Sequence, residues 1–422
     1  MTTPPVPATE PPLTIRQLPR NVWAASLTSF FTDISSEMII NILPLYLANV
    51  LGVGTGVIGV IEGVAESTAS LLKIFSGWIS DRLRARKWPA VVGYGLSAFS
   101  KPFFLIASTW QLVALVRWAD RVGKGVRTAP RDALVADSIE PRARGLAFGF
   151  HRAADTAGAV LGLAIALLVV WAAQATAANL TASTFQRLVL VSLLPALLAV
   201  VVLAFGAREV PVTKQRARPR FAIGALGKPF VTFLFINGLF ALGNSSDAFI
   251  VLRAQDRGLS VVAILAMLLS FNVLYALIST PAGRLSDRIG RRRLIVAGWL
   301  IYAVIYAGFA LAQAGWHVWA LYVVYGLYYG LTYGTTKALL TDLVPEGLRA
   351  TAFGTHEAMQ GLMLLPASVI AGVLWQGVGG WGGLGAWAPF AFGAAMALAA
   401  AVCLALWKPQ TLPAAQSAQP PI

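Results

Sequence analysis

The chain has 422 residues, of which 57% are hydrophobic and only 12% are charged. Apolar stretches of about 20 residues recur from end to end, which excludes an ordinary soluble protein and predicts a polytopic membrane protein. The stretches are continuous rather than alternating, so they predict α-helices and exclude a β-barrel. The formal net charge is +15.

Twelve apolar segments predict twelve transmembrane helices. They are expected at 22–50, 56–79, 88–109, 110–133, 146–171, 187–207, 229–252, 259–282, 293–313, 316–343, 351–376 and 387–407. The loops between them alternate between strongly basic and nearly uncharged, so the positive-inside rule places both termini in the cytoplasm. The positive excess therefore sets topology, and we expect no nucleic-acid partner.

The span pattern divides the chain into five parts. We expect a disordered cytoplasmic N-terminus at 1–21, a six-helix bundle at 22–207, a basic cytoplasmic linker at 208–228, a second six-helix bundle at 229–407 and a disordered cytoplasmic tail at 408–422. The N-terminus is polar and rich in proline, and it lacks the apolar core of a signal peptide.

The second half of the chain repeats the first. SGWISDRLRARK recurs as AGRLSDRIGRRR, and ADSIEPRARGLAFGFH recurs as TDLVPEGLRATAFGTH. A weaker echo pairs Ser35-Ser36-Glu37 with Ser245-Ser246-Asp247. Such repeats predict two pseudo-symmetric bundles, a substrate site between them near the bilayer midplane, and transport by rocking. The chain has no P-loop, so we expect no ATP dependence.

Twelve spans, a six-plus-six duplication and the motif G-x-x-x-D-R-x-G-R-R between the second and third spans of each half resemble the major facilitator superfamily. The physical role expected of this motif is to latch the two bundles and so control gating. Its first copy has Arg84 where the family has a second glycine. The motif residues are Gly77, Asp81, Arg82 and Arg86 in the first half and Gly283, Asp287, Arg288, Gly290, Arg291 and Arg292 in the second.

Glycines in two further spans resemble family signatures in part. Gly123 and Gly125 follow Arg117 in span four, with Arg121 replacing the first glycine of the signature. In span five, Gly149, Gly158 and Gly162 have the spacing found in family exporters, without the proline and final glycines. Helix packing alone also accounts for such glycines, so they support efflux only weakly.

Charged residues lie at membrane depth in the first half, where a charge needs a partner or water. On span one, Asp33 and Glu37 share a helical face. At 1.5 Å of rise per residue, Asp33 is level with Arg121 of span four at a depth of about 16–18 Å, and Glu37 is level with Arg117, which predicts these two ion pairs. Buried pairs stabilise poorly, so a proton-carrying role is favoured over a static one. The proton-coupling candidates are Asp33, Glu37, Glu62, Glu66 and Asp155, and the charged residues of span four expected to pair with such groups are Arg117, Asp120, Arg121 and Lys124.

The second half is aromatic rather than charged. Tyr322, Tyr325, Tyr329 and Tyr333 follow one face of span ten, a stripe equally consistent with packing and with an aromatic or amphipathic substrate. The substrate-cavity candidates are Asn41, Asn237, Asn244, Asp247, Tyr325, Tyr329 and Tyr333. We therefore expect the first bundle to couple protons and the second to provide an aromatic binding surface.

These features predict a proton-coupled secondary transporter of the bacterial inner membrane that exports a small toxic solute, drug-like or metal. We expect a monomer in the bilayer that uses the proton gradient and no cofactor. The segments TDISSEM and GKGVRTAPRDALVADS resemble a bacterial branch that includes resistance permeases, among them nickel-resistance proteins.

Several alternatives stay open. Divalent-metal efflux would use Glu37, Glu62, Glu66 and Asp155 together with the histidines as ligands, although three His and one Cys are few for this purpose. Uptake of a small organic anion would use Arg117, Arg121, Lys124 and Lys101. A non-transporting receptor or scaffold would not need acids and bases on cavity-lining helices. We find no nucleophile or metal cluster that predicts an enzyme.

Overall fold

The computed structural model describes residues 14–140, 143–210, 226–344 and 348–408. The expected disordered ends and the expected linker at 208–228 fall mostly outside these ranges. The described elements are helical. They are η1 (Ile15–Gln17), α1 (Arg20–Ile40), α2 (Leu43–Asn49), α3 (Thr55–Arg82), α4 (Lys87–Ser100), η2 (Lys101–Leu105), α5 (Trp110–Asp137), α6 (Arg144–Gln174), α7 (Ala182–Gly206), α8 (Gly227–Gly243), α9 (Ala248–Asp256), α10 (Val261–Ile289), α11 (Arg291–Leu311), α12 (Gly315–Leu343), α13 (Arg349–Gln376) and α14 (Ala388–Leu406).

These helices make up the twelve expected spans, and three spans consist of two pieces each. Span one breaks after Ile40, and Pro44, which cannot donate an interior helix bond, lies in the first turn of α2. Span three continues from α4 into η2, where Pro102 follows Lys101. Span seven breaks after Gly243, where Asn244 has non-helical dihedrals (φ −100°, ψ 77°).

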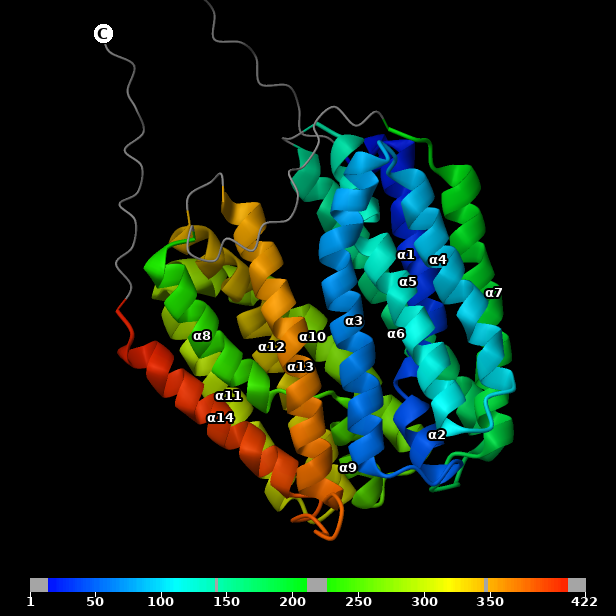
Figure 1. Cartoon of the computed structure of the whole chain (residues 1–422), viewed down its shortest axis with the longest axis vertical. Helices are drawn as coiled ribbons and strands as arrows, with labels where there is room; N and C mark the ends of the chain where they lie inside the picture. The colour runs from blue at the N-terminus through cyan, green and yellow to red at the C-terminus, as the bar shows by residue number, and fades with distance from the viewer. Residues whose placement is uncertain (1–13, 141–142, 211–225, 345–347, 409–422) are drawn as a thin grey trace, which may run out of the picture.

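The helices form two bundles that follow one another in the chain. In Figure 1, α1–α7 occupy one side of the molecule and α8–α14 the other. In the first bundle α1 packs on α6 and α7, while α5 packs on α3 and α4. In the second bundle α11 packs on α12 and α14, while α10 packs on α12. The bundles meet along two seams, α3 against α13 and α6 against α10.

The α3–α13 seam is closest at the end of the molecule that carries α2 and α9, here called the α9 end. A Cβ atom added at Gly59 would meet the backbone carbonyl of Ser368, and one added at Gly63 would lie 2.9 Å from the Cα of Leu365. Small residues therefore allow the two backbones to touch. In Figure 1 the two helices converge toward this end.

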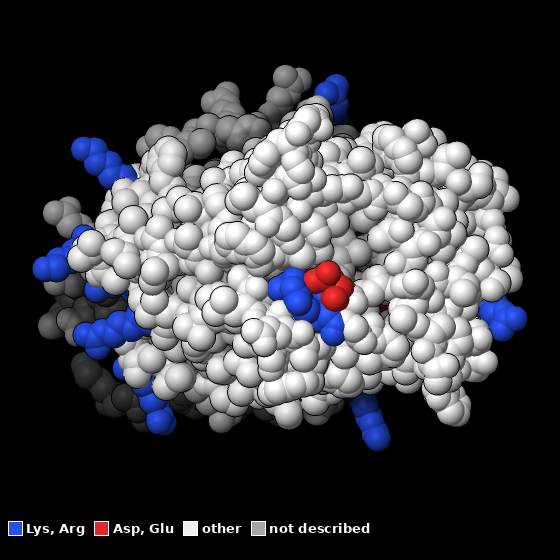
Figure 2. Space-filling model, turned by 90° about the horizontal axis from the view of Figure 1, so that it is seen from below, with Lys and Arg blue, Asp and Glu red and all other residues white. Residues whose placement is uncertain are grey.

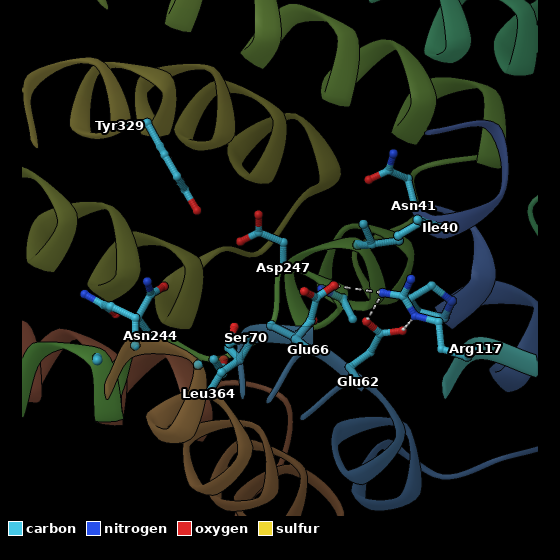
Figure 3. Close-up of a pocket in the computed structure, with 18 of the residues that line it drawn as sticks. Ile40, Asn41, Glu62, Glu66, Ser70, Arg117, Asn244, Asp247, Tyr329 and Leu364 are labelled. Atoms are coloured by element: carbon cyan, nitrogen blue, oxygen red, sulfur yellow. Dashed lines mark hydrogen bonds and ion pairs between the residues drawn. The ribbon is translucent and has the colours of Figure 1, made fainter. Parts of the chain in front are cut away.

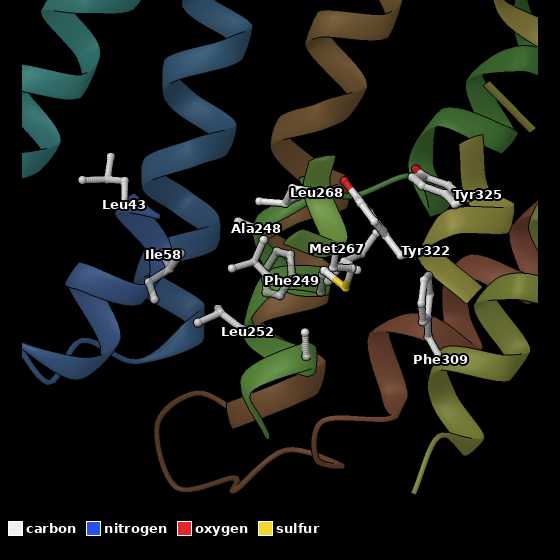
Figure 4. Packing of buried hydrophobic residues seen from close by; sticks show 14 of the residues in the cluster. Leu43, Ile58, Ala248, Phe249, Leu252, Met267, Leu268, Phe309, Tyr322 and Tyr325 are labelled. Atoms are coloured by element: carbon white, nitrogen blue, oxygen red, sulfur yellow. The ribbon is translucent and has the colours of Figure 1, made fainter. Parts of the chain in front are cut away.

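An apolar plug joins the bundles at the α9 end. Leu43 of α2 and Ile58 of α3 are buried in the same cluster as Phe249 and Leu252 of α9, and Figure 4 shows them side by side. A Cβ at Gly59 would also lie 3.0 Å from the ring of Phe249. The closed seam and this plug seal the interior from the α9 end.

The two ends of the molecule differ in charge. The face at the α9 end carries few charged side chains away from its rim, as Figure 2 shows. The opposite end, here called the basic end, holds Arg82, Arg84, Lys87, Arg144 and Arg291 at the ends of α3, α4, α6 and α11. Seven helical segments of the described chain are long and apolar enough to cross a membrane on length and composition alone, and the charged α5 is not among them.

One expected repeat is wrong in structural terms. Ser35, Ser36 and Glu37 lie within helix α1, whereas Ser245, Ser246 and Asp247 lie at the break between α8 and α9. The break in span seven instead matches the break in span one at Asn41 and Ile42. Three similar letters in a polar stretch suggested a register that is about one helical turn too early.

Candidate functional site

A cavity of about 380 Å³ lies between the bundles, a size that suits a small organic molecule. Both broken spans open onto it, through Asn41 on one side and Asn244 on the other. Figure 3 shows Glu62, Glu66 and Arg117 facing Asn244, Asp247 and Tyr329 across this space. Its lining residues are Ile40, Asn41, Pro44, Glu62, Glu66, Ser70, Arg117, Ala241, Asn244, Ser245, Ser246, Asp247, Ala248, Val251, Leu268, Tyr329, Glu357, Gln360, Gly361 and Leu364.

Arg117 is the centre of the charges on the first bundle. Its Nη2 donates to Glu62 Oε2 at 2.7 Å and its Nε donates to Glu62 Oε1 at 3.1 Å, a two-point contact. Glu66 Oε1 lies 3.3 Å from the same Nη2 and 2.9 Å from Nε of Arg121. Asp120 lies within 4.0 Å of both arginines. Glu66 is thus shared by two guanidinium groups at the cavity wall.

The predicted pairs Asp33–Arg121 and Glu37–Arg117 are therefore wrong. Matching depth places two residues at one level of the membrane, but it does not say which helices are neighbours. Helix α5 packs directly on α3, which carries Glu62 and Glu66, whereas α1 packs mainly on α6 and α7. The arginines take the carboxylates of the adjacent helix. Lys124, the remaining span-four candidate, is exposed.

The other coupling candidates lie apart from the cavity wall. Glu37 accepts from Asn41 Nδ2 at 2.6 Å, next to the break in span one. Asp33 is half-buried on α1. Asp155 lies 3.5 Å from Nδ1 of His151, whose Nε2 is 3.0 Å from the Ser29 hydroxyl. Of the five candidates, Glu62 and Glu66 line the cavity.

Lys101 was assigned only to the organic-anion alternative, yet it has a specific place in the first bundle. It is 3% exposed, and its Nζ donates to the hydroxyls of Ser35 at 2.5 Å and Ser36 at 3.2 Å. The TDISSE segment therefore holds a buried lysine. A lysine just before a proline inside an apolar span is the sequence signal that pointed to it.

The second bundle contributes Asp247 to the cavity. Asp247 is the residue before α9, and its carboxylate makes no capping hydrogen bond to that helix. The hydroxyl of Tyr325 lies 3.4 Å from its Oδ1. Figure 3 shows Tyr329 extending from α12 toward Asp247. Asn244, Asp247 and Tyr329 are thus where the sequence analysis expected them.

Three other cavity candidates lie elsewhere. Asn237 is 2% exposed and lies 2.7 Å from Nε2 of His356, so it packs α8 on α13. Tyr325 is fully buried and reaches the cavity only through its contact with Asp247. Tyr333 lies nearer the basic end, 3.1 Å from Nζ of Lys337. Gln360 was missed, although it follows Glu357 by three residues on the same helical face.

The first copy of the gating motif makes its described contacts within its own bundle. Buried Asp81 pairs with Arg86, whose Nε lies 3.0 Å from Asp137 on α5. Arg84 takes a left-handed conformation (φ 51°), the geometry for which the family uses glycine. The tight turn therefore forms without the glycine. Arg82 packs on the ring of Trp78.

The second copy also contacts its own bundle. Gly290 has φ 92° and precedes α11. Arg291 lies 2.5 Å from Asp342 Oδ1, and Arg292 donates to the carbonyl of Trp407. Arg288 is exposed, while Gly283 and Asp287 lie outside the residues whose side chains are described. The contacts of these described residues join helices of one half rather than latching the halves together.

The comparisons with known proteins identify the family. The model of the Major Facilitator Superfamily matches residues 25–361 and 230–421. This chain belongs to the major facilitator superfamily. It is 35% identical to an uncharacterized MFS-type transporter of Methanocaldococcus jannaschii over 86% of this chain and 90% of that protein. It is 24% identical to the multidrug resistance protein MdtG of Citrobacter koseri over 81% of this chain and 84% of MdtG.

Solved structures of the superfamily share the fold. A point mutant of the nucleoside transporter NupG superposes with a TM-score of 0.75 at 14% identity, covering 91% of this chain and 99% of NupG. The chain is therefore a multi-pass membrane transporter of this superfamily and not an enzyme. Its cavity between the halves is the place where such a protein binds its solute.

Proposed function

We propose that this transporter exports a small toxic solute in exchange for protons, by alternating access of the cavity between its bundles. The observation that carries the proposal is Glu66, shared by Arg117 and Arg121 and 26% exposed at the cavity wall. Protonation of Glu66 removes its charge, breaks its contact with Arg121 and changes the electrostatics of the wall. A proton gradient can therefore act on the geometry of the cavity.

The direction of transport is supported by two features. The printed name of the relative MdtG describes multidrug resistance. The cavity is sealed at the α9 end, and the positive-inside rule assigns that weakly charged end to the outside and the basic end to the cytoplasm. A solute would then enter from the cytoplasm, in a bacterial inner membrane, and the protein would act as a monomer with both termini inside.

The metal and anion alternatives receive less support. The described residues contain no group of three or more His, Cys, Asp or Glu side chains placed to hold a metal ion. Arg117 and Arg121, which would attract an anion, already contact Glu62 and Glu66. An organic solute fits the partly aromatic cavity better.

The test begins with a deletion strain screened against aromatic cations, organic anions and divalent metals. The compound to which the strain becomes most sensitive is then given to proteoliposomes with an acidic interior. We expect wild-type protein to accumulate it and Glu66→Gln to bind it without accumulating it. Asp155→Asn, away from the cavity, serves as the matched control. Equal accumulation with and without the pH gradient would refute proton coupling.

A further inference from the structure

The charges that line the cavity leave one carboxylate without a basic partner. Glu62 lies 2.7 Å from Arg117, Glu66 lies 2.9 Å from Arg121, and Glu357 lies 3.5 Å from Nζ of Lys73. No ion pair among the described residues includes Asp247, the fourth lining carboxylate. The uncompensated charge at the cavity wall is therefore a single negative charge, on the second bundle.

The backbone presents this carboxylate to the cavity. An aspartate just before a helix usually turns back to accept the first free N–H groups of that helix. Asp247 makes no such hydrogen bond to α9. Its contact with the Tyr325 hydroxyl, at 3.4 Å, is near the long limit for a hydrogen bond. Most of its acceptor capacity faces the cavity.

Aromatic rings surround the same position. Tyr329 lines the cavity and packs edge-on against Phe271, with ring centroids 5.5 Å apart, and against Tyr325 at 5.2 Å. Tyr322 also packs on Phe271, with ring centroids 4.9 Å apart. Aromatic faces attract cations, most strongly where water is excluded. A carboxylate beside such rings is the arrangement that recognises an organic cation.

We propose that Asp247 and the rings of Tyr322, Tyr325, Tyr329 and Phe271 form a binding site for a lipophilic aromatic monocation. The proposal rests on the proposed function and specifies its solute. One unpaired negative charge selects a single positive charge and leaves a divalent metal uncompensated. The aromatic wall favours a charge spread over rings rather than a small hydrated amine.

The test uses two ions of one shape and opposite charge, tetraphenylphosphonium and tetraphenylborate. Binding of each to the purified full-length protein is measured separately by calorimetry, without a pH gradient. We expect saturable phosphonium binding that Asp247→Asn weakens by about tenfold or more. Asp247→Glu should keep most of the affinity, and size-exclusion profiles report whether each variant is folded.

Glu357→Gln is the matched control because it also removes a negative charge from the cavity wall. Equal weakening by Glu357→Gln and Asp247→Asn would show that only the overall potential matters and would overturn the proposal. So would unchanged binding to Asp247→Asn, no saturable phosphonium binding, or tighter binding of the borate. Because binding is measured at equilibrium, it can fail while proton-driven flux of another solute succeeds, and the reverse.

Discussion

Arg117 shows how a single residue organises the first half of the cavity. It is 1% exposed, and it satisfies two glutamates of the neighbouring helix. Its value as a stabiliser is modest, because both partners lost water when they were buried. Removing one partner is a different matter, since the remaining charges are then buried without compensation.

Arg117→Met should therefore destabilise the protein by about 3–5 kcal/mol, because Glu62 loses its guanidinium partner. Adding Glu62→Gln should recover much of that loss. Thermal unfolding in detergent of the wild type, both single variants and the double variant measures the coupling. Arg187→Met, at an exposed position on α7, should leave the melting temperature unchanged. A double variant no more stable than Arg117→Met would contradict the pairing.

Arg84 provides a second prediction at this scale. Its left-handed backbone costs about 1 kcal/mol that glycine would avoid, and its side chain is exposed. Arg84→Gly should raise the melting temperature by about a degree or two. The reciprocal change Gly290→Arg should lower it, because Gly290 has φ 92°. A lower melting temperature for Arg84→Gly would mean that the arginine side chain contributes more than its backbone costs.

At the scale of helices, the glycines of the spans act mainly through close approach. Gly123 packs on α4, where its Cβ would lie 2.6 Å from the carbonyl of Gly93. Gly158 and Gly162 pack α6 on the backbone of α1 at Phe30 and Ile34. Helix packing, the plainer of the two interpretations of these glycines, accounts for their positions in this structure.

Gly59→Val should open the α9 end, because the added methyl groups cannot fit between α3 and the Ser368 carbonyl. A cysteine placed at Ser246 in a Cys403→Ser background reports this opening through a membrane-impermeant maleimide added outside. We expect faster labelling with Gly59→Val. Gly95→Val is the control, because a Cβ there meets nothing within 4 Å. Equal labelling rates in both would show that this seam does not seal the cavity.

Hydrophobic stretches and loop charge predicted the spans well, because each span must satisfy its backbone internally and each loop its side chains. The charge on span four was also a correct guide to the cavity, since Arg117 lines it. The partners were not predictable, because one sequence shows which residues share a helical face but not which helices are neighbours. The breaks at Asn41 and Asn244 were missed as well, since an apolar span with an asparagine reads as continuous.

At the scale of the molecule, the two halves divide the work unequally. The first half gathers paired charges around Arg117, and the second half places Asp247 among tyrosines. Both sets face one cavity that is closed at the α9 end. The described gating-motif contacts stay within each half, so they hold the shape of a bundle while the bundles are apart at the basic end. Rocking the halves would then carry one cavity past both sides of the membrane.

The most direct test of this account measures proton movement driven by the solute itself. Proteoliposomes containing a pH-sensitive dye receive a gradient of the exported compound, identified by the deletion-strain screen, without any imposed pH difference. Inward movement of the compound should make the interior alkaline in wild-type vesicles, and Glu66→Gln should abolish this signal while compound exchange continues. Solute entry with no change in internal pH in the wild type, or an unchanged proton signal in Glu66→Gln, would contradict the account.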